Sequence, residues 1–174
     1  MSEDVFAKGP HDFGDTPEVA VLMGSPSDWS TMELTHKWLA DMDIGHEVRV
    51  ISAHRTPARH EAYVSSAKER GTKLFICAAG LAAHLAGVTA AVTELPVLGV
   101  PMKGGVSEGL DALLSTVQMP AGVSVATFAV GSHGARNAAV MALQILALGD
   151  AKHAATLAKF RADQSASVPM YPGQ

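Results

Sequence analysis

The chain has 174 residues but only one cysteine, Cys77, and only 17% charged residues. A single cysteine excludes an internal disulfide and fits a reducing compartment. Lysine and arginine number 13 against 17 aspartates and glutamates, so the net charge of −4 gives no reason to expect nucleic acid or an anionic membrane as partner. No apolar run reaches the roughly 18 residues of a membrane span, and the acidic, polar start is unlike a signal peptide. We therefore expect a cytoplasmic protein.

Several enzyme signatures are also missing. The sequence has no cluster of histidines, cysteines or carboxylates at metal-ligand spacing and no Gly-x-Gly-x-x-Gly fingerprint for a dinucleotide. It has no serine or cysteine nucleophile with a dedicated base, and Cys77 lies in an apolar run typical of a small core residue. These absences argue against a metal site and against covalent catalysis.

Hydrophobic residues, at 48%, are abundant enough to fill one core and leave apolar surface for other subunits. Strand-like and helix-like segments alternate five times. Strands are expected at residues 18–23, 45–51, 73–78, 96–100 and 123–129, and helices at 26–42, 57–70, 79–93, 107–116, 135–148 and 151–162. This order predicts a single domain, a three-layer α/β/α sandwich with a central parallel sheet, flavodoxin-like or Rossmann-like.

The domain is expected over residues 17–149. Residues 1–16 have no periodicity, and we expect a flexible lead. The helix at 135–148 is apolar nearly all round, which indicates burial in the core and against other subunits. Residues 150–174 form a last helix and a tail that we expect to pack on a neighbouring subunit.

The hexapeptide at residues 52–57 stands between a predicted strand and a predicted helix. Pro57 suits the first helical position and Thr56 the N-cap, so Ser52, His54 and Arg55 occupy a turn at the carboxyl end of a strand. Ligands bind at that edge of open α/β sheets, and an imidazole beside a guanidinium suits an anionic substrate that exchanges a proton. The alternative is that His54 and Arg55 simply lie on a solvent-exposed turn and have no functional role. In the following helix, Arg59 and His60 are expected to be exposed.

Two further turns belong to the same edge. In the first, Ser25 and Asp28 match a capping box, and with Ser27 they are alternatively a cradle for phosphate or ribose. In the second, small residues over 79–87 allow close approach of a ligand or a subunit, and His84 is either a packed histidine or a site residue. Because right-handed crossovers place such turns on one edge, we expect the three to converge, or to face one another across a subunit boundary. The loop 103–105 only weakly suggests phosphate binding, because it lacks the P-loop spacing.

Five motifs in register carry a resemblance that covers residues 18–148. These are Met23-Gly24-Ser25-Pro26-Ser27-Asp28-Trp29, the hexapeptide 52–57, Ala82-Ala83-His84-Leu85, Pro96-Val97-Leu98-Gly99-Val100-Pro101 and Ser115-Thr116-Val117-Gln118-Met119-Pro120. Together they closely resemble the class I N5-carboxyaminoimidazole ribonucleotide mutases of purine biosynthesis, the PurE family. The resemblance implies an isomerase that moves a carboxylate from the exocyclic nitrogen of an aminoimidazole ribonucleotide to ring carbon 4. It implies no metal or other cofactor, and a homo-octamer whose sites neighbouring subunits complete.

The resemblance also implies roles for single residues. His54 matches the general acid/base of the family, and Ser25, Asp28 and Arg55 match residues that bind the ribonucleotide. By position, Ser27 is expected to help hold phosphate. The residues expected to line the pocket, with the stretch 79–87 as a wall against loss of carbon dioxide, are Ser52, Gly80, His84 and Leu85.

The chain departs from the usual family pattern in three places. Leu81 stands where glycine is usual, Ala86 where proline is frequent, and Lys103-Gly104-Gly105 replaces a more polar stretch. Two alternatives stay open. One is the class II enzyme, which carboxylates the unsubstituted ribonucleotide with free carbon dioxide and tends to have lysine where this chain has Arg55. The other is a non-catalytic nucleotide-binding module on the same fold.

Overall fold

The computed structural model describes residues 4–171. Within that range, five parallel strands form one sheet in the order β2-β1-β3-β4-β5. The strands are β1 (Val19–Met23), β2 (His46–Val50), β3 (Leu74–Ala79), β4 (Val97–Pro101) and β5 (Ala126–Thr127). This order is that of a flavodoxin-like doubly wound sheet, and it confirms the predicted fold class.

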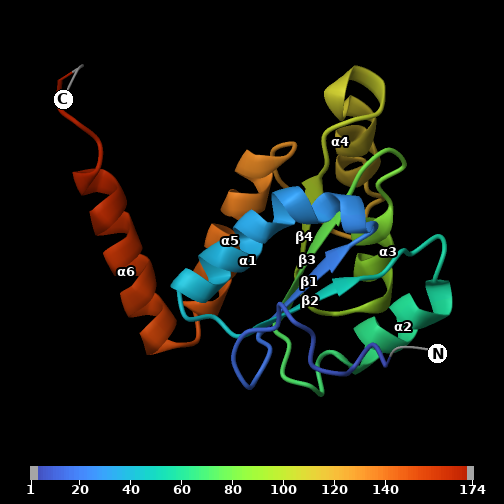
Figure 1. Ribbon diagram of the computed structural model, residues 1–174, viewed down its shortest axis with the longest axis horizontal. Helices are drawn as coiled ribbons and strands as arrows, with labels where there is room; N and C mark the ends of the chain where they lie inside the picture. Colours follow the sequence, from blue (N-terminus) through green and yellow to red (C-terminus); the bar gives the residue numbers. More distant parts are fainter. Residues whose placement is uncertain (1–3, 172–174) are drawn as a thin grey trace.

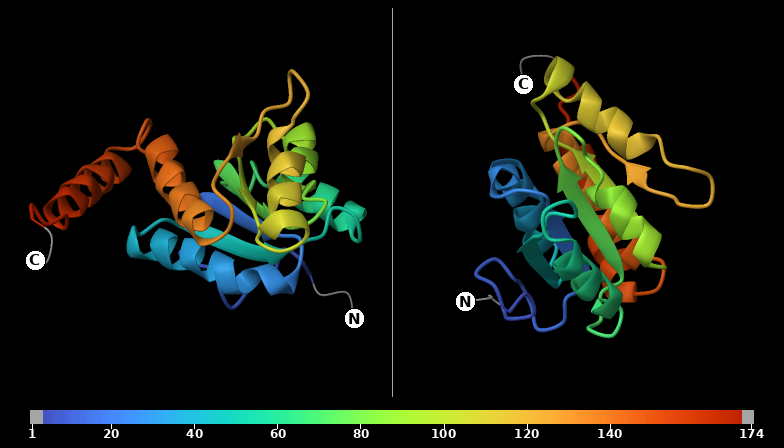
Figure 2. Two further views of the ribbon diagram at one scale, coloured as in Figure 1. Left: turned by 90° about the horizontal axis from the view of Figure 1, so that it is seen from above. Right: turned by 90° about the vertical axis from the view of Figure 1, so that its right-hand side faces the viewer.

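Helices cover both faces of this sheet (Figures 1 and 2). Helices α1 (Trp29–Asp41) and α5 (Ser132–Leu146) pack together on one face, and α2 (Pro57–Ser66), α3 (Leu85–Val92) and α4 (Leu110–Val117) cover the other. Short 3-10 turns, η1 (Pro26–Asp28) and η2 (Val106–Glu108), precede α1 and α4. The molecule is therefore the predicted three-layer sandwich.

The central strands are buried on both sides, which explains their nearly continuous apolar sequences. Side chains of a strand alternate between the faces, so Val19, Val21 and Met23 join the core under α1 and α5, while Ala20 and Leu22 join the core under α2 and α3. Two separate cores on one rigid sheet hold the strand ends, and thus the turns that follow them, in fixed relative positions.

Strand β2 departs from the alternation that its sequence suggests. His46 and Arg49 are buried, whereas Val50 is 41% exposed. The reason is that β2 is an edge strand partly covered by the N-terminal segment. Asp12 accepts hydrogen bonds from Arg49, and Phe13 forms a β-bridge with His46. These contacts argue against a flexible lead for the described part of residues 1–16.

Two predicted boundaries also change. Strand β5 has only two residues instead of the seven at 123–129. Thr56 precedes α2, but its side chain caps no helical N–H; the hydroxyl donates to the carbonyl of Ser52 at 2.9 Å. Thr56 is the N-cap residue and Pro57 begins the helix, as the sequence predicted, but the Thr56 hydroxyl itself takes no part in the cap.

Helix α6 (Ala151–Ala166) extends from the body of the domain (Figure 1). Its first turn is fixed by the Asp150 cap and by His153, whose Nε2 lies 3.0 Å from a carboxylate oxygen of Glu18. Further along, Trp38 and Phe160 meet edge to face at 5.4 Å. Most of the remaining helix is exposed in the single chain. Over residues 4–171, we find no helix with the length and apolar character needed to cross a membrane.

Burial favours the neutral form of three histidines outside the turn 52–57. His46 is fully buried, with its Nε2 2.8 Å from Nδ1 of His36. Burial lowers the pKa of His46, His36 and His60, and at His36 the neighbouring His11 adds to this effect. The native chain therefore binds fewer protons at these positions than the unfolded chain in mildly acidic solution.

We expect the free energy of unfolding to fall as the pH decreases below the ordinary histidine value of 6.5. The sign follows because the unfolded chain takes up protons there and the native chain resists them. Urea denaturation at a series of pH values between 8 and 5 would measure the slope. His60→Gln should flatten it, and a stability that does not change over this range would contradict the argument.

Candidate active site

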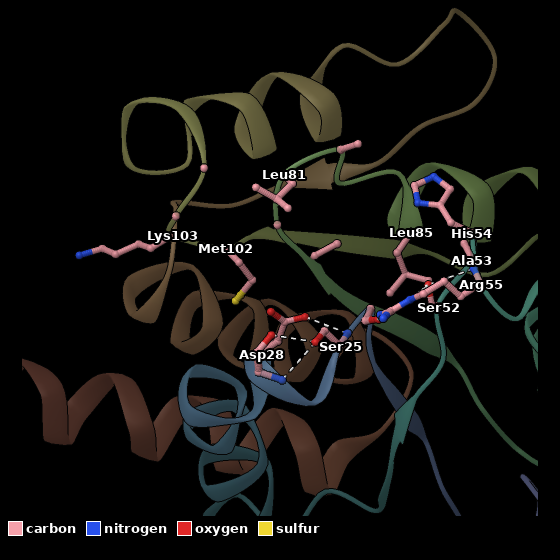
Figure 3. Close-up of a pocket in the computed structure, with 17 residues that line it drawn as sticks. Ser25, Asp28, Ser52, Ala53, His54, Arg55, Leu81, Leu85, Met102 and Lys103 are labelled. Carbon is pink, nitrogen blue, oxygen red and sulfur yellow. Dashed lines mark hydrogen bonds between the residues drawn. The ribbon is translucent and has the colours of Figure 1, made fainter.

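A cavity of about 460 Å³ opens at the carboxyl edge of the sheet (Figure 3). It lies where β1 and β3 are adjacent and the chain turns to opposite faces, which is the usual ligand position in doubly wound folds, and its size suits a small-molecule ligand. Its lining residues are Gly24, Ser25, Ser27, Asp28, Ser52, Ala53, His54, Arg55, Ala79, Gly80, Leu81, Ala82, Leu85, Met102, Lys103, Gly104 and Gly105. The turns 24–28, 52–57 and 79–87 thus converge as predicted.

The turn after β1 is a complete capping box. The backbone N–H of Ser27 donates to Oγ of Ser25 at 3.3 Å, and that of Ser25 donates to the Asp28 carboxylate at 3.1 Å. The hydroxyl of Ser27 also donates to Oγ of Ser25 at 2.8 Å. All three side chains belong to the cavity wall, so the two alternatives for this turn, a cap and a ligand cradle, are compatible.

Asp28 is a half-buried acid in this wall. Burial raises the pKa of its carboxyl group, and the hydrogen bond from Ser25 and the positive charge of Arg55 oppose that rise. A carboxylate placed in this way can accept hydrogen bonds from the hydroxyls of a sugar. It also balances part of the positive charge that Arg55 brings to the site.

Arg55 connects the turn after β2 to the turn after β1. Its Nη2 donates to the carbonyl of Gly24 at 2.7 Å, while its Nε and backbone N–H each donate to Oγ of Ser52 at 3.2 Å. Ser52 therefore orients the guanidinium group, and Arg55 holds the two turns together. The side chain is exposed toward the cavity, where it can attract an anion.

His54 and His84 form a pair of imidazoles at one end of the cavity. Nε2 of His54 lies 3.1 Å from Nδ1 of His84, and the two rings are nearly perpendicular. His54 lines the cavity, but His84 does not. The expectation that His84 lines the pocket is therefore corrected: it reaches the site through its contact with His54.

His60 is buried, not exposed as the sequence led us to expect. Only 2% of it is accessible, and its Nε2 lies 2.8 Å from the hydroxyl of Thr89, which donates to the carbonyl of Leu85 at 2.8 Å. The reason is that the face of α2 that carries His60 packs against α3. The contact fixes the helix that follows His54 against the helix that follows His84. Arg59 is exposed as expected.

Sequence reasoning missed part of the wall. Met102 lines the cavity although no sequence pattern pointed to it, whereas Gly24, Ala53, Ala79 and Ala82 belong to the three turns that were expected there. The loop 103–105 also lines the cavity, although its pattern alone indicated little. The available signal was its position, because a loop after β4 lies on the same edge of the sheet as the three turns.

The described residues offer no group of three or more histidines, cysteines or carboxylates that could hold a metal ion. Burial raises the pKa of the Cys77 thiol to about 12, which makes it a poor nucleophile. The chemistry that the cavity can perform rests on other groups. It combines a guanidinium, serine hydroxyls and a carboxylate with an imidazole at one end, a set suited to a phosphorylated sugar whose attached group gains and loses a proton.

Comparisons with known proteins agree over nearly the whole chain. The sequence model of the family described as AIR carboxylase matches residues 18–167. N5-carboxyaminoimidazole ribonucleotide mutase of Vibrio parahaemolyticus is 48% identical over 155 residues, which are 89% of this chain and 96% of that protein. The protein of the same name from Pyrococcus abyssi is 50% identical over 147 residues, 84% of this chain and 83% of that protein.

The fold leads to the same group. A crystal structure of Treponema denticola PurE superposes with a TM-score of 0.76 at 27% identity, over 86% of this chain and 92% of that one. The motifs that line the cavity lie inside the matched residues 18–167. The chain therefore belongs to the AIR carboxylase family.

Proposed function

We propose that this chain is an N5-carboxyaminoimidazole ribonucleotide mutase of purine biosynthesis. The observation that carries the proposal is the cavity itself. His54, Arg55, Ser25 and Asp28 all line it, in a chain that is about half identical to proteins of that name over nearly its full length. The reaction is an isomerisation that moves a carboxylate from the exocyclic nitrogen of the substrate to ring carbon 4.

The contacts around the cavity support a binding role for each of these residues. Serine hydroxyls at the start of η1 suit the phosphate, and those of Ser25 and Ser27 belong to residues that line the cavity there. Asp28 is placed to accept from ribose hydroxyls. Arg55, oriented by Ser52, provides the positive charge that anions of the substrate require. Gly80 and Leu85 form the part of the wall against which the ring can lie.

His54 moves one proton twice. A protonated imidazole gives its proton to the carbamate nitrogen, the carbon–nitrogen bond breaks, and carbon dioxide leaves. Carbon 4 of the enamine-like ring then attacks carbon dioxide, and a new carbon–carbon bond forms. The proton now in excess on carbon 4 returns to His54, and the ring regains its aromaticity. A group that titrates near neutrality suits both steps, and His84, in contact with His54, can orient the ring.

The reaction needs carbon dioxide to stay beside the ring. Holding both fragments in one cavity converts a bimolecular recombination into an oriented, effectively unimolecular one, an advantage that can reach about 7–11 kcal/mol. Small and apolar residues form part of the wall beside which carbon dioxide would have to be held.

An assay with two substrates tests the proposal. The purified chain is given the N-carboxylated ribonucleotide in one reaction and the unsubstituted ribonucleotide with bicarbonate in another. Fast conversion of the first alone supports the mutase. Fast conversion of the second identifies a class II carboxylase instead, and binding without conversion of either identifies a nucleotide-binding module.

We also propose a cytoplasmic homo-octamer in which α6 packs on a neighbouring subunit. Leu110, Leu114 and Val117 form an exposed apolar stripe on α4, here called the α4 stripe. Val88 and Val92 are exposed on α3. Exposed apolar surface of this kind favours burial against copies of the same chain.

Leu114→Glu should weaken the assembly, because a carboxylate in the α4 stripe would be buried without a partner. Light scattering coupled to size-exclusion chromatography would show smaller particles than for the native chain. Ala62→Glu adds the same charge at an exposed position of α2 outside the stripe and should leave the particle size unchanged. Equal assembly of both variants and the native chain would exclude the α4 stripe as an interface.

A further inference from the structure

His60 is a buried titratable side chain that the proposed reaction does not use. Only 2% of it is exposed, and its Nε2 lies 2.8 Å from the hydroxyl oxygen of Thr89, which is fully buried. The same hydroxyl lies 2.8 Å from the carbonyl oxygen of Leu85. A carbonyl only accepts, so the hydroxyl hydrogen points to Leu85, and Nε2 of His60 donates to Thr89. The three groups form a directed chain of hydrogen bonds inside the protein.

This chain of hydrogen bonds joins two short helices. His60 belongs to α2, of 10 residues, and Thr89 to α3, of 8 residues, and neither helix has a side-chain hydrogen bond at its N-cap. Helices of this length are marginal on their own, so contacts with the rest of the fold fix their positions. Within residues 4–171, the contact between His60 and Thr89 is the only hydrogen bond between α2 and α3. A buried hydrogen bond needs a defined distance and angle, so it fixes the relative position of the two helices more narrowly than apolar packing does.

On the α2 side, the contact lies one helical turn beyond the turn that carries His54. The N–H of His60 donates to the carbonyl of Thr56 at 3.0 Å. The N–H and the hydroxyl of Thr56 both donate to the carbonyl of Ser52, at 2.8 and 2.9 Å. These bonds close the turn 52–56 and connect it directly to the position of His60.

On the α3 side, the contact lies just past the residue that meets His54. Leu85, whose carbonyl accepts from Thr89, lines the cavity and follows His84 directly. In Figure 3, Leu85 and His54 lie at the same end of the cavity, far from Lys103. A shift of α3 relative to α2 would therefore move His84 relative to His54.

The contact between His54 and His84 is sensitive to such a shift. Both residues are exposed, so little packing restrains their rings, and the distance of 3.1 Å between Nε2 of His54 and Nδ1 of His84 is near the upper end of a hydrogen bond. A displacement of about 0.5 Å would break this bond. The pair of imidazoles therefore depends on the packing of the helices beneath it.

We propose that His60 is a positioning residue that, through Thr89, holds α3 against α2 and keeps His84 within hydrogen-bond distance of His54. This inference rests on the proposed mutase function, in which His54 moves the proton. An imidazole that has lost its partner rotates more freely and is less often aligned with the nitrogen and carbon 4 of the substrate. Substrate binding should change little, because Arg55 is oriented by contacts outside α2 and α3.

Matched substitutions at the two ends of the contact test this role by steady-state kinetics. Valine has nearly the size of threonine but no hydroxyl, so Thr89→Val should lower kcat by about 10-fold with KM close to native, since a small misplacement of catalytic groups can cost up to about 100-fold. Thr89→Ser keeps the hydroxyl and should have nearly native kinetics. His60→Gln keeps an N–H donor of similar reach and should retain most of the turnover. His60→Met has a similar reach without a donor and should lose about as much as Thr89→Val.

A double-mutant cycle separates positioning from stability. His84→Asn removes the imidazole that meets His54 and should lower kcat in the native chain. In the Thr89→Val background that contact is already lost, so adding His84→Asn should lower kcat little further. Independent effects would instead multiply, and a multiplied loss would overturn the proposal.

Ile44→Val is the control for stability. Ile44 is fully buried in the core under α1 and α5, so its truncation should lower the unfolding temperature and leave kcat and KM unchanged. Native kcat in Thr89→Val, or a kcat that follows the unfolding temperature in all of these variants, would overturn the role of His60 while leaving the mutase function standing. A native chain that does not isomerise the substrate would overturn the proposed function and this inference together.

Discussion

His54→Asn should bind the ribonucleotide with nearly native affinity and lose turnover by about 10²–10⁴-fold. Asparagine keeps a polar side chain of similar reach at the end of the cavity, but it does not titrate near neutrality. Arg55, Ser25 and Asp28, which we expect to hold the substrate, remain in place because their contacts do not involve His54. The loss should therefore fall on kcat and not on KM.

Steady-state kinetics and calorimetric titration with the product nucleotide separate the two effects. His11→Asn is the control, because His11 lies against Trp29 outside the cavity and should show native turnover. The pH–rate profile of the native enzyme should contain one ionisation that His54→Asn removes. Turnover close to native in His54→Asn would remove His54 from its role as acid and base, whatever its position.

Much of this site follows from local sequence and one rule of topology. A buried parallel strand has a nearly continuous apolar sequence, and a capping box has a fixed spacing, so β1 and the turn of Ser25 and Asp28 could be predicted from a few residues. The convergence of the three turns followed from the handedness of the crossovers, which acts on every parallel strand pair. That rule needs no knowledge of side-chain contacts.

The errors have a common physical cause: contacts between residues far apart in the chain. His60 was expected to be exposed, because the sequence does not show which side α3 would cover. Residues 4–16 lack periodicity, yet Asp12 and Phe13 are fixed by β2, more than thirty residues later. The contact between His84 and His54 depends on how α2 and α3 pack against each other. Local propensity cannot supply any of these.

The ion pair between Arg49 and Asp12, which ties the N-terminal segment to β2, gives the largest expected effect on stability. The Arg49 and Asp12 side chains are only 9% and 6% exposed and form a bidentate pair, and Arg49 also donates to the carbonyls of Val5 and Ala7. Asp12→Ala would leave the guanidinium buried without its main counter-charge. Removing one partner of a buried pair typically costs about 3–5 kcal/mol, and the remaining carbonyl acceptors place the expected loss near the lower end, about 3 kcal/mol.

Urea denaturation at neutral pH measures this loss, and an exposed pair provides the control. Glu33→Ala removes the partner of Lys37 on α1, where both side chains are largely in solvent, and should cost no more than about 1 kcal/mol. Burial alone would raise the pKa of Asp12. The hydrogen bonds that its carboxylate accepts from Arg49, Gly9 and Val48 outweigh burial and lower the pKa below its ordinary 3.8. The pair therefore stabilises the native chain above that pH, and its contribution is lost as the pH falls through the lowered value. The difference in free energy of unfolding between the native and Asp12→Ala proteins should shrink in the same acidic range. If Asp12→Ala and Glu33→Ala lowered the free energy of unfolding equally at neutral pH, the N-terminal segment would not depend on this pair.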